Sequence, residues 1–153
     1  MMKMIELKGM MLVGIRIVCP SDQYAIEIPK AAIQLKNRLN EITGIVNCDG
    51  FIGAFVVEEL SEADDGYWVC VEVDMFGEIP AGMVTLTIPA QKYAMIRHSG
   101  PNTSIHDTYE SLHRWEAEQG LERLKGAWHL EISRKWYEAN SDEIEIDLYD
   151  TVR

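Results

Sequence analysis

The sequence predicts an α+β fold in which two β-α-β-β units form one antiparallel sheet, with two helices on one face and a ligand cleft on the other. Two observations support this prediction. The same order of strand-like and helix-like segments occurs twice in the 153 residues, and a Gly- and Pro-containing connector, FGEIPAG at residues 76–82, separates the copies. Because neither copy alone could cover both a sheet and a helix, we expect a single domain over residues 1–153, with pseudo-repeats at about 1–75 and 83–153 related by a pseudo-twofold axis.

The first copy starts with a strand at residues 10–18, MMLVGIRIV, which is apolar enough to be largely buried. Apolar residues then recur with helical spacing from Ile28 to Ile42, and Gly44 follows the last of them. Pro29 stands in the expected first turn, where proline is tolerated. Two more strands complete the copy, FIGAFVVEEL at residues 51–60 and YWVCVEVDM at residues 67–75.

The second copy repeats this order with shorter loops. A strand is expected over residues 83–101, MVTLTIPAQKYAMIRHSGP. Ser104 is a typical N-cap residue, and Gly120 closes the helix that follows it. The last two strands are AWHLEISRKW at residues 127–136 and EIEIDLY at residues 143–149.

Alternation along the strands assigns side chains to the two faces of the sheet. In the last strand the isoleucines point toward the helices, whereas Glu145 and Tyr149 point away. The strand YWVCVEVDM likewise directs its valines toward the helices and Trp68 and Glu72 away from them. We expect the strands at 51–60 and 127–136 to turn Phe55 and Glu131 to that same outer face, with Trp128, Leu130 and Ile132 turned inward.

Glu72 and Glu145 are of particular interest because each lies between β-branched apolar residues, at what look like matching points of the two copies. An acid beside aromatic side chains can offset the desolvation of a ligand cation. The alternative is that these acids are solvated residues of an exposed strand face. Both interpretations remain open at this point.

Composition excludes several function classes. The net charge of −11 opposes direct binding to nucleic acid, and no segment approaches the ~18 apolar residues of a membrane-spanning helix. Three cysteines without paired spacing indicate buried thiols in a reducing cytoplasm: Cys19, Cys48 and Cys70. The histidines have no metal-binding spacing, and no phosphate loop or dinucleotide motif is present. We therefore predict no metal, no cofactor and no catalytic residue.

Long stretches of the chain resemble the GyrI-like small-molecule-binding family. The segments IPAQKYAMIRHSGP, SIHDTYESLHRWEAEQGL and EIEIDLY carry this resemblance, and MLVGIRI with IPKAAIQLKNRLNEI is most similar to its integron-associated, YdeE-like branch. The family comprises stand-alone relatives of the effector-binding domains of AraC-type and multidrug-responsive activators. The resemblance implies an aromatic cavity between the two units, in which a buried Glu meets the cation of a lipophilic ligand. Asp147 departs from the family pattern, which usually has Tyr there.

The resulting prediction is a non-enzymatic cytoplasmic protein that binds lipophilic, cationic small molecules for sensing or sequestration. Its ligand-binding candidates are three acids and five aromatic residues: Glu145, Glu131, Glu72, Trp68, Phe55, Tyr93, Tyr149 and Trp136. One alternative is a hydrolase of electrophilic small molecules, in which Glu131 or Glu145 acts with Tyr93 or Tyr149. Another is a protein-binding module, such as a gyrase-modulating protein.

Overall fold

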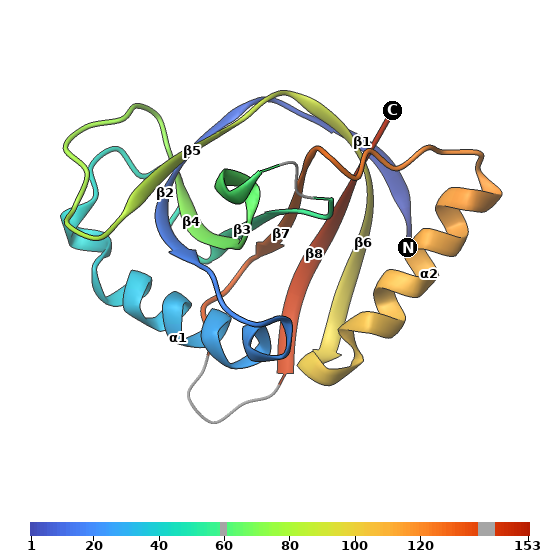
Figure 1. The fold of residues 1–153 in the computed structure, drawn as a ribbon, viewed down its shortest axis with the longest axis horizontal. Coiled ribbons are helices and arrows are strands. Elements are labelled where there is room, and N and C mark those ends of the chain that lie inside the picture. Colours follow the sequence, from blue (N-terminus) through green and yellow to red (C-terminus); the bar gives the residue numbers. More distant parts are fainter. Residues whose placement is uncertain (59–60, 138–142) are drawn as a thin grey trace.

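A computed structural model describes residues 1–58, 61–137 and 143–153. These residues form one eight-stranded sheet and two long helices, with short 3-10 turns between them (Figure 1). The helices are α1 (Tyr24–Asn37) and α2 (Ile105–Glu118). The strands are β1 (Lys3–Leu7), β2 (Met10–Ile17), β3 (Phe51–Val56), β4 (Tyr67–Val73), β5 (Val84–Ile88), β6 (Gln91–Pro101), β7 (Trp128–Ser133) and β8 (Glu143–Val152).

The sheet confirms the predicted α+β class and its pseudo-twofold arrangement. Its strand order is β1-β6-β8-β7-β3-β4-β2-β5, all antiparallel, so β3 and β7 lie at the centre. The strands β2 and β6 start at Met10 and Gln91, and the helices start at Tyr24 and Ile105, so each pair is 81 residues apart. Each half also contributes one edge strand to the other half, because β1 pairs with β6 and β5 pairs with β2.

The bounds of several elements differ from the sequence prediction. The strand expected over residues 83–101 is divided at Pro89 into β5 and β6, because proline has no N–H to donate to a ladder. The additional strand β1 was not predicted, since its exposed alternate residues weaken the apolar pattern. The helix α1 begins earlier than expected, so Pro29 is its sixth residue rather than part of its first turn. Residues 59 and 60 of the predicted strand 51–60 lie outside the described residues.

Glu72 and Glu145 are not equivalent positions of the two halves. Leu12 of β2 pairs with Glu72, and Tyr93, which lies 81 residues after Leu12, pairs with Thr151. The counterpart of Glu72 is therefore Thr151, near the end of β8, while Glu145 lies near its beginning. A pattern with a period of two residues aligns equally well at every second position, which explains the incorrect match.

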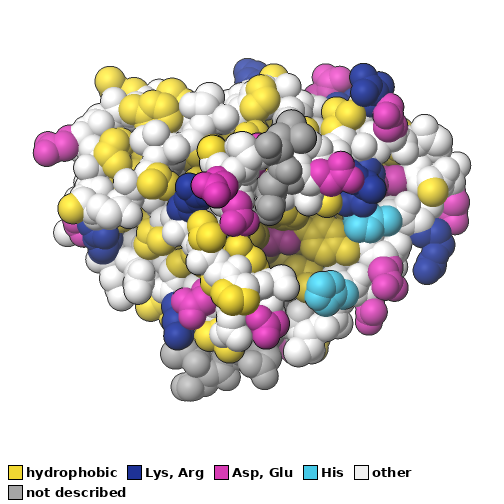
Figure 2. Space-filling model, viewed as in Figure 1, with side chains coloured by type: hydrophobic (Ala, Val, Ile, Leu, Met, Phe, Trp, Pro, Cys, Tyr) yellow, Lys and Arg dark blue, Asp and Glu magenta, His cyan; other side chains and the backbone are white. Residues whose placement is uncertain are grey.

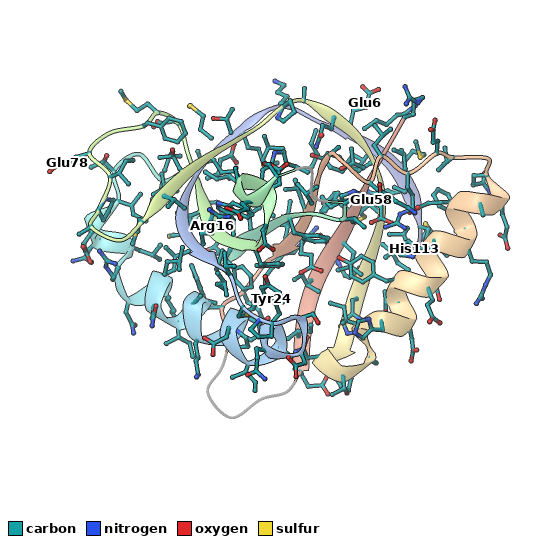
Figure 3. The ribbon with its side chains drawn as sticks, in the orientation of Figure 1. Glu6, Arg16, Tyr24, Glu58, Glu78 and His113 are labelled. Carbon is teal, nitrogen blue, oxygen red and sulfur yellow. The ribbon has the colours of Figure 1, made fainter. Side chains whose placement is uncertain are left out.

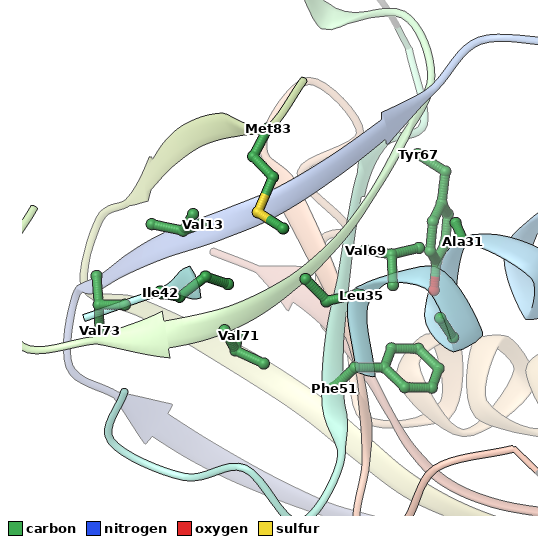
Figure 4. Packing of buried hydrophobic residues seen from close by; sticks show 11 residues of the cluster. Val13, Ala31, Leu35, Ile42, Phe51, Tyr67, Val69, Val71, Val73 and Met83 are labelled. Atoms are coloured by element: carbon green, nitrogen blue, oxygen red, sulfur yellow. The ribbon is translucent and has the colours of Figure 1, made fainter. Parts of the chain in front are cut away.

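The face of the sheet under the helices holds two of the three apolar clusters. Ala32 and Leu35 of α1 are fully buried against valines of β2 and β4, including Val13, Val69 and Val71 (Figure 4). Leu112 of α2 packs in the same way against β6 and β8. Each helix therefore covers the outer strands of its own half, and the central strands β3 and β7 run between them (Figure 1).

The opposite face holds a third core, and a hollow of about 410 Å³ beside it is lined by Glu72 and Tyr149 among other residues. Trp68, Tyr93 and Tyr149 are buried there, with apolar residues of β1 and β5 packed against them. The two edge strands arch across this side of the strongly curved sheet (Figure 1). Alternation along a strand cannot reveal such curvature, which is why this face was expected to be open.

The side chains of β3 and β7 also point to the faces opposite to those predicted. Phe55 packs in the cluster under α1, whereas Leu130 lies in the core of the opposite face together with Trp128 and Ile132. Glu131 therefore points toward the helices. Both alternate sets of β3 contain apolar or small residues, FIGAFV, so the sequence pattern did not determine which set faces the helices.

The three cysteines differ in their exposure to solvent. Cys70 is buried, but Cys19 is partly exposed and Cys48 is exposed, contrary to the expectation of three buried thiols. All three are free.

Within the described ranges, neither helix is long and apolar enough to cross a membrane.

Candidate functional site

A cavity of about 470 Å³ lies between the two helices, on the helix face of the sheet. The space-filling view shows an acidic group deep within an otherwise apolar hollow (Figure 2). Tyr24 lines it from the first turn of α1, where the two helices approach each other (Figure 3). Most of the other side chains of its floor and walls are aromatic or aliphatic, and a few are polar: Ile28, Phe55, Tyr67, Ile105, Tyr109, Glu131, Tyr137, Ile144 and Ile146, with Ser21, Asn102, Thr103 and His106.

Glu131 of β7 is the acid at the floor of this cavity, and two tyrosines hold its carboxyl group. The Tyr67 hydroxyl donates to Oε1 over 2.6 Å, and the Tyr109 hydroxyl donates to Oε2 in a short hydrogen bond. These tyrosines come from β4 and α2, 64 and 22 residues away in sequence. The carboxyl orientation therefore depends on three separate elements, and part of Glu131 still faces the cavity.

Burial raises the pKa of Glu131, and the hydrogen bonds from Tyr109 and Tyr67 oppose that rise because they favour the charged form. The pKa values of Tyr67 and Tyr109 are raised well above the ordinary value by burial and by the neighbouring Glu131 charge. Burial also raises the pKa of Tyr137 to about 12. The three phenols therefore stay protonated, and two of them act as fixed donors to one carboxyl group.

Aromatic contacts fix the cavity walls. Phe55 stacks on Tyr67 with ring centroids 5.8 Å apart and planes inclined by 13°. Behind the walls, Phe55 also stacks on His129, and Tyr109 contacts His113, which lies on the side of α2 that faces the sheet (Figure 3). Side chains held in this way provide an apolar surface that is formed before any ligand arrives.

Of the eight residues predicted to bind ligand, two line this cavity: Glu131 and Phe55. Trp68, Tyr93 and Tyr149 belong to the core of the opposite face, where the Arg16 guanidinium already lies 4.9 Å above the Trp68 ring.

The remaining three candidates also lie outside the cavity. Trp136 packs on Phe51 and donates its indole N–H to the carbonyl of Cys48. Glu145 belongs to the set of β8 residues that points away from the helices. Glu72, together with Tyr149, lines a separate hollow of about 410 Å³ on the opposite face.

Sequence reasoning missed the two tyrosines that bind Glu131. Tyr67 begins β4 in the same alternate set as Val69, so alternation places it on the helix face. Tyr109 lies one helical turn after Ile105, on the apolar stripe of α2. Both positions were visible in the sequence, but their convergence on Glu131 required the correct face for β7.

The described part of the chain contains no group of three His, Cys, Asp or Glu side chains that could hold a metal ion. The chemistry available in the cavity is that of one carboxyl group, four phenols and mostly apolar walls, with the polar side chains of Ser21, Asn102, Thr103 and His106 also in its lining.

Residues 3–152 match the family of integron-associated effector binding proteins. The chain belongs to this family. The match confirms the resemblance seen in the sequence and extends over both halves. It establishes an effector-binding domain, in agreement with a cavity enclosed by both halves of the pseudo-twofold fold.

Solved structures share this effector-binding fold at low sequence identity. The structure of SAV2435 bound to tetraphenylphosphonium is similar with a TM-score of 0.73 and 16% identity, covering 100% of this chain and 94% of the other. The EcmrR C-terminal domain is similar with a TM-score of 0.71 and 19% identity, covering 100% and 97%. At these identities the comparisons show the fold.

A curated relative is the transcriptional regulator BrlR of Pseudomonas aeruginosa. It is 30% identical over 79 residues, which are 51% of this chain and 29% of BrlR. The match thus covers less than a third of that regulator.

Proposed function

We propose that this effector-binding protein binds lipophilic organic cations in the cavity between α1 and α2, with Glu131 as the counter-charge. One observation carries the proposal: a carboxyl group lies at the floor of an aromatic cavity and is held there by two tyrosine hydroxyls. The volume of about 470 Å³ is within the range of small-molecule sites.

The charge of Glu131 favours a cationic ligand over a neutral one. Burial makes the ionised carboxylate costly, as the direction of its pKa shift indicates. A cation placed against the carboxylate offsets this cost, and the aromatic rings around it interact favourably with positive charge. A neutral ligand of the same shape would leave the charge unpaired.

The hydrogen bonding of Glu131 favours cations that carry few N–H groups. A primary ammonium has three strong donors, each of which needs an acceptor once it leaves water. Each carboxyl oxygen of Glu131 already accepts one phenol and keeps at most one further acceptor site, and most of the surrounding wall consists of apolar side chains such as Ile28, Ile105 and Ile144. A delocalised cation without donors needs only the charge and the apolar surface.

The ligand bound to SAV2435 supports this ligand class, because tetraphenylphosphonium is a lipophilic cation without N–H donors. We propose that binding serves sensing or sequestration in a reducing compartment such as the cytoplasm. The two hydrolase pairs that involve Glu131 gain no support, since Tyr93 and Tyr149 lie across the sheet from Glu131.

Calorimetric titration with tetraphenylphosphonium tests the proposal. Glu131→Gln keeps the size of the side chain and removes its charge, so affinity should fall about tenfold or more, corresponding to roughly 1.4 kcal/mol or more. The matched control is Glu145→Gln, the same change on the opposite face, which should bind like the native protein.

Two outcomes would contradict this assignment. Equal affinity of the native protein and Glu131→Gln, with the fold intact by circular dichroism, would rule out Glu131 as the counter-charge. Disappearance of the ligand during incubation with an electrophilic lipophile, followed by mass spectrometry, would instead favour the hydrolase.

A further inference from the structure

Glu131 has a symmetry counterpart, and that counterpart is a glycine. Gly14 and Met95 are 81 residues apart and pair with Cys70 and Tyr149 respectively. In the next ladders, Cys70 pairs with Ile52 and Tyr149 pairs with Leu130. The residues that follow are Gly53 and Glu131, which also face each other directly across the central β3–β7 pair. One half thus supplies the carboxyl group, and the other supplies a residue without a side chain.

Gly53 lies under the side chain of Tyr67. The strands follow one another as β7, β3 and β4, so Tyr67 is two strands away from Glu131 and Gly53 lies between them. Adjacent strands are about 4.8 Å apart, so Glu131 and Tyr67 are separated by two such spacings. Their side chains can meet only by passing over β3. A Cβ atom at Gly53 would overlap the hydroxyl and Cζ of Tyr67 and lie 2.8 Å from its Cε1. The φ angle of Gly53 is not in the left-handed region, so space and not backbone conformation requires a glycine here.

We propose that Gly53 is a positioning residue: its missing side chain lets the Tyr67 hydroxyl reach Glu131, and this hydrogen bond keeps the carboxylate charged for cation binding. The inference deepens the proposed function and rests on it for its consequence, but the geometry of Gly53, Tyr67 and Glu131 stands by itself. Tyr67 cannot simply move aside, because it is buried and stacked on Phe55.

The electrostatic consequence follows from the hydrogen bond. A phenol donating to the carboxylate lowers the pKa of Glu131, so loss of this donor must raise it. The other titratable groups near Glu131 would stay in place: Tyr109 and His106 on α2, His98 on β6, Asp150 on β8, Tyr24 on α1 and Tyr137 after β7. A change at Gly53 therefore isolates the contribution of Tyr67.

The test is a titration of the Glu131 side-chain carboxyl carbon by 13C NMR in the ligand-free protein, with Glu131→Gln identifying the signal. Gly53→Ala should raise the pKa of Glu131 by about one unit, a tenfold change in proton affinity. Tyr67→Phe should produce a similar shift, and the double variant should show no further shift, because the donor is already lost.

Gly126→Ala is the matched control. It is the same substitution at a glycine with nothing within 4 Å of the added carbon, so it should leave the pKa of Glu131 unchanged. An unshifted pKa in folded Gly53→Ala would overturn the proposal. A further upward shift in the double variant beyond Tyr67→Phe would also overturn it, because Gly53 would then act by a route other than Tyr67.

Two additional measurements keep the inference testable. If Gly53→Ala does not fold, Gly53→Ala/Tyr67→Leu should be as stable as Tyr67→Leu alone, because the ring that the new methyl group meets is gone; a further loss of stability would contradict the proposal. As the pH is lowered and Glu131 takes up a proton, tetraphenylphosphonium affinity should decline over the same pH interval in the native protein and in Gly126→Ala. Gly53→Ala should lose affinity at a higher pH than either. Failure of all proteins to bind this cation would refute the proposed function, while the ligand-free titration would still decide the role of Gly53.

Discussion

Two buried acids of the second half, Glu131 and Glu116, show two different ways of placing a carboxyl group in the interior. Glu131 faces the cavity and accepts hydrogen bonds from two phenols. Glu116 is buried under α2 beside Asp150 and Arg123, with the Arg123 Nε 3.6 Å from its Oε1, and its carboxyl group forms a side-chain hydrogen bond with that of Asp150.

The pKa values reflect this difference in surroundings. Burial and the neighbouring Asp150 raise the pKa of Glu116 to about 8, so Glu116 holds a proton at neutral pH. The pKa of Asp150 is lowered, because His129, Glu116 and Arg123 favour its charged form more than burial opposes it. The comparison teaches that donors allow a buried carboxylate to present its charge to a ligand, whereas an acidic neighbour leads to neutralisation by a proton.

The largest expected effect is a loss of folding stability when Asp150, the charged neighbour of Glu116, is replaced. Asp150→Asn removes the buried charge that faces Arg123 Nε at 3.3 Å and His113 Nε2 at 2.9 Å, whose side chains are 23% and 35% exposed. Removing one partner of a buried charge cluster costs about 3 kcal/mol or more. Urea unfolding at pH 7 measures the loss.

Asp147→Asn on the same strand is the control for this substitution. Asp147 is equally buried, but its partners Arg97 and Arg134 are 42% and 60% exposed and can be hydrated when left alone. Its loss of stability should therefore be smaller. Equal losses in the two variants would show that burial of the partners does not decide the cost.

The second effect is a pH dependence caused by Glu116. Its folded pKa of about 8 is above the ordinary 4.5, so its stabilising contribution is complete below pH 4.5 and is lost as pH rises to about 8. The native protein should lose on the order of 2 kcal/mol across this interval, and Glu116→Gln should flatten the dependence. Thermal unfolding from pH 4.5 to 8.5 tests this, and a profile unchanged by Glu116→Gln would contradict it.

A smaller effect concerns the stability of the ligand-free cavity. The pKa of Glu131 is raised, so its contribution to stability is present at low pH and lost as pH rises through the folded pKa. Glu131→Gln should therefore stabilise the ligand-free protein at pH 7 by about 1 kcal/mol while weakening cation binding, a trade of stability for function. A lower melting temperature in Glu131→Gln would mean that the phenol–carboxylate hydrogen bonds outweigh the cost of burying the charge.

The smallest effect is expected at Glu145, which the sequence presented as the leading binding residue. It pairs with Ser99 of β6 and points away from the helices, so Glu145→Gln should change stability by less than ~0.5 kcal/mol. Its affinity for tetraphenylphosphonium should equal that of the native protein. Weaker binding by this variant would restore the sequence-based assignment.

Local patterns were sufficient to predict much of the fold. Helical spacing identified both helices, Gly and Pro marked the connector, and alternation correctly oriented β4 and β8, since in these strands one alternate set is clearly more apolar than the other. The order of the elements then determined the fold class, because two such units can bury their apolar surfaces only by pairing.

The site depended on information that alternation does not contain. In β3 and β7 both alternate sets can be buried, so only packing against the helices and edge strands decided that Phe55 and Glu131 face the cavity. The sequence by itself determined that the chain has acids and tyrosines on alternating strands of a duplicated fold. The tertiary structure decided which of them meet, because Glu131, Tyr67 and Tyr109 come from three elements, and a hydrogen bond depends on positions in space that a one-dimensional pattern does not specify.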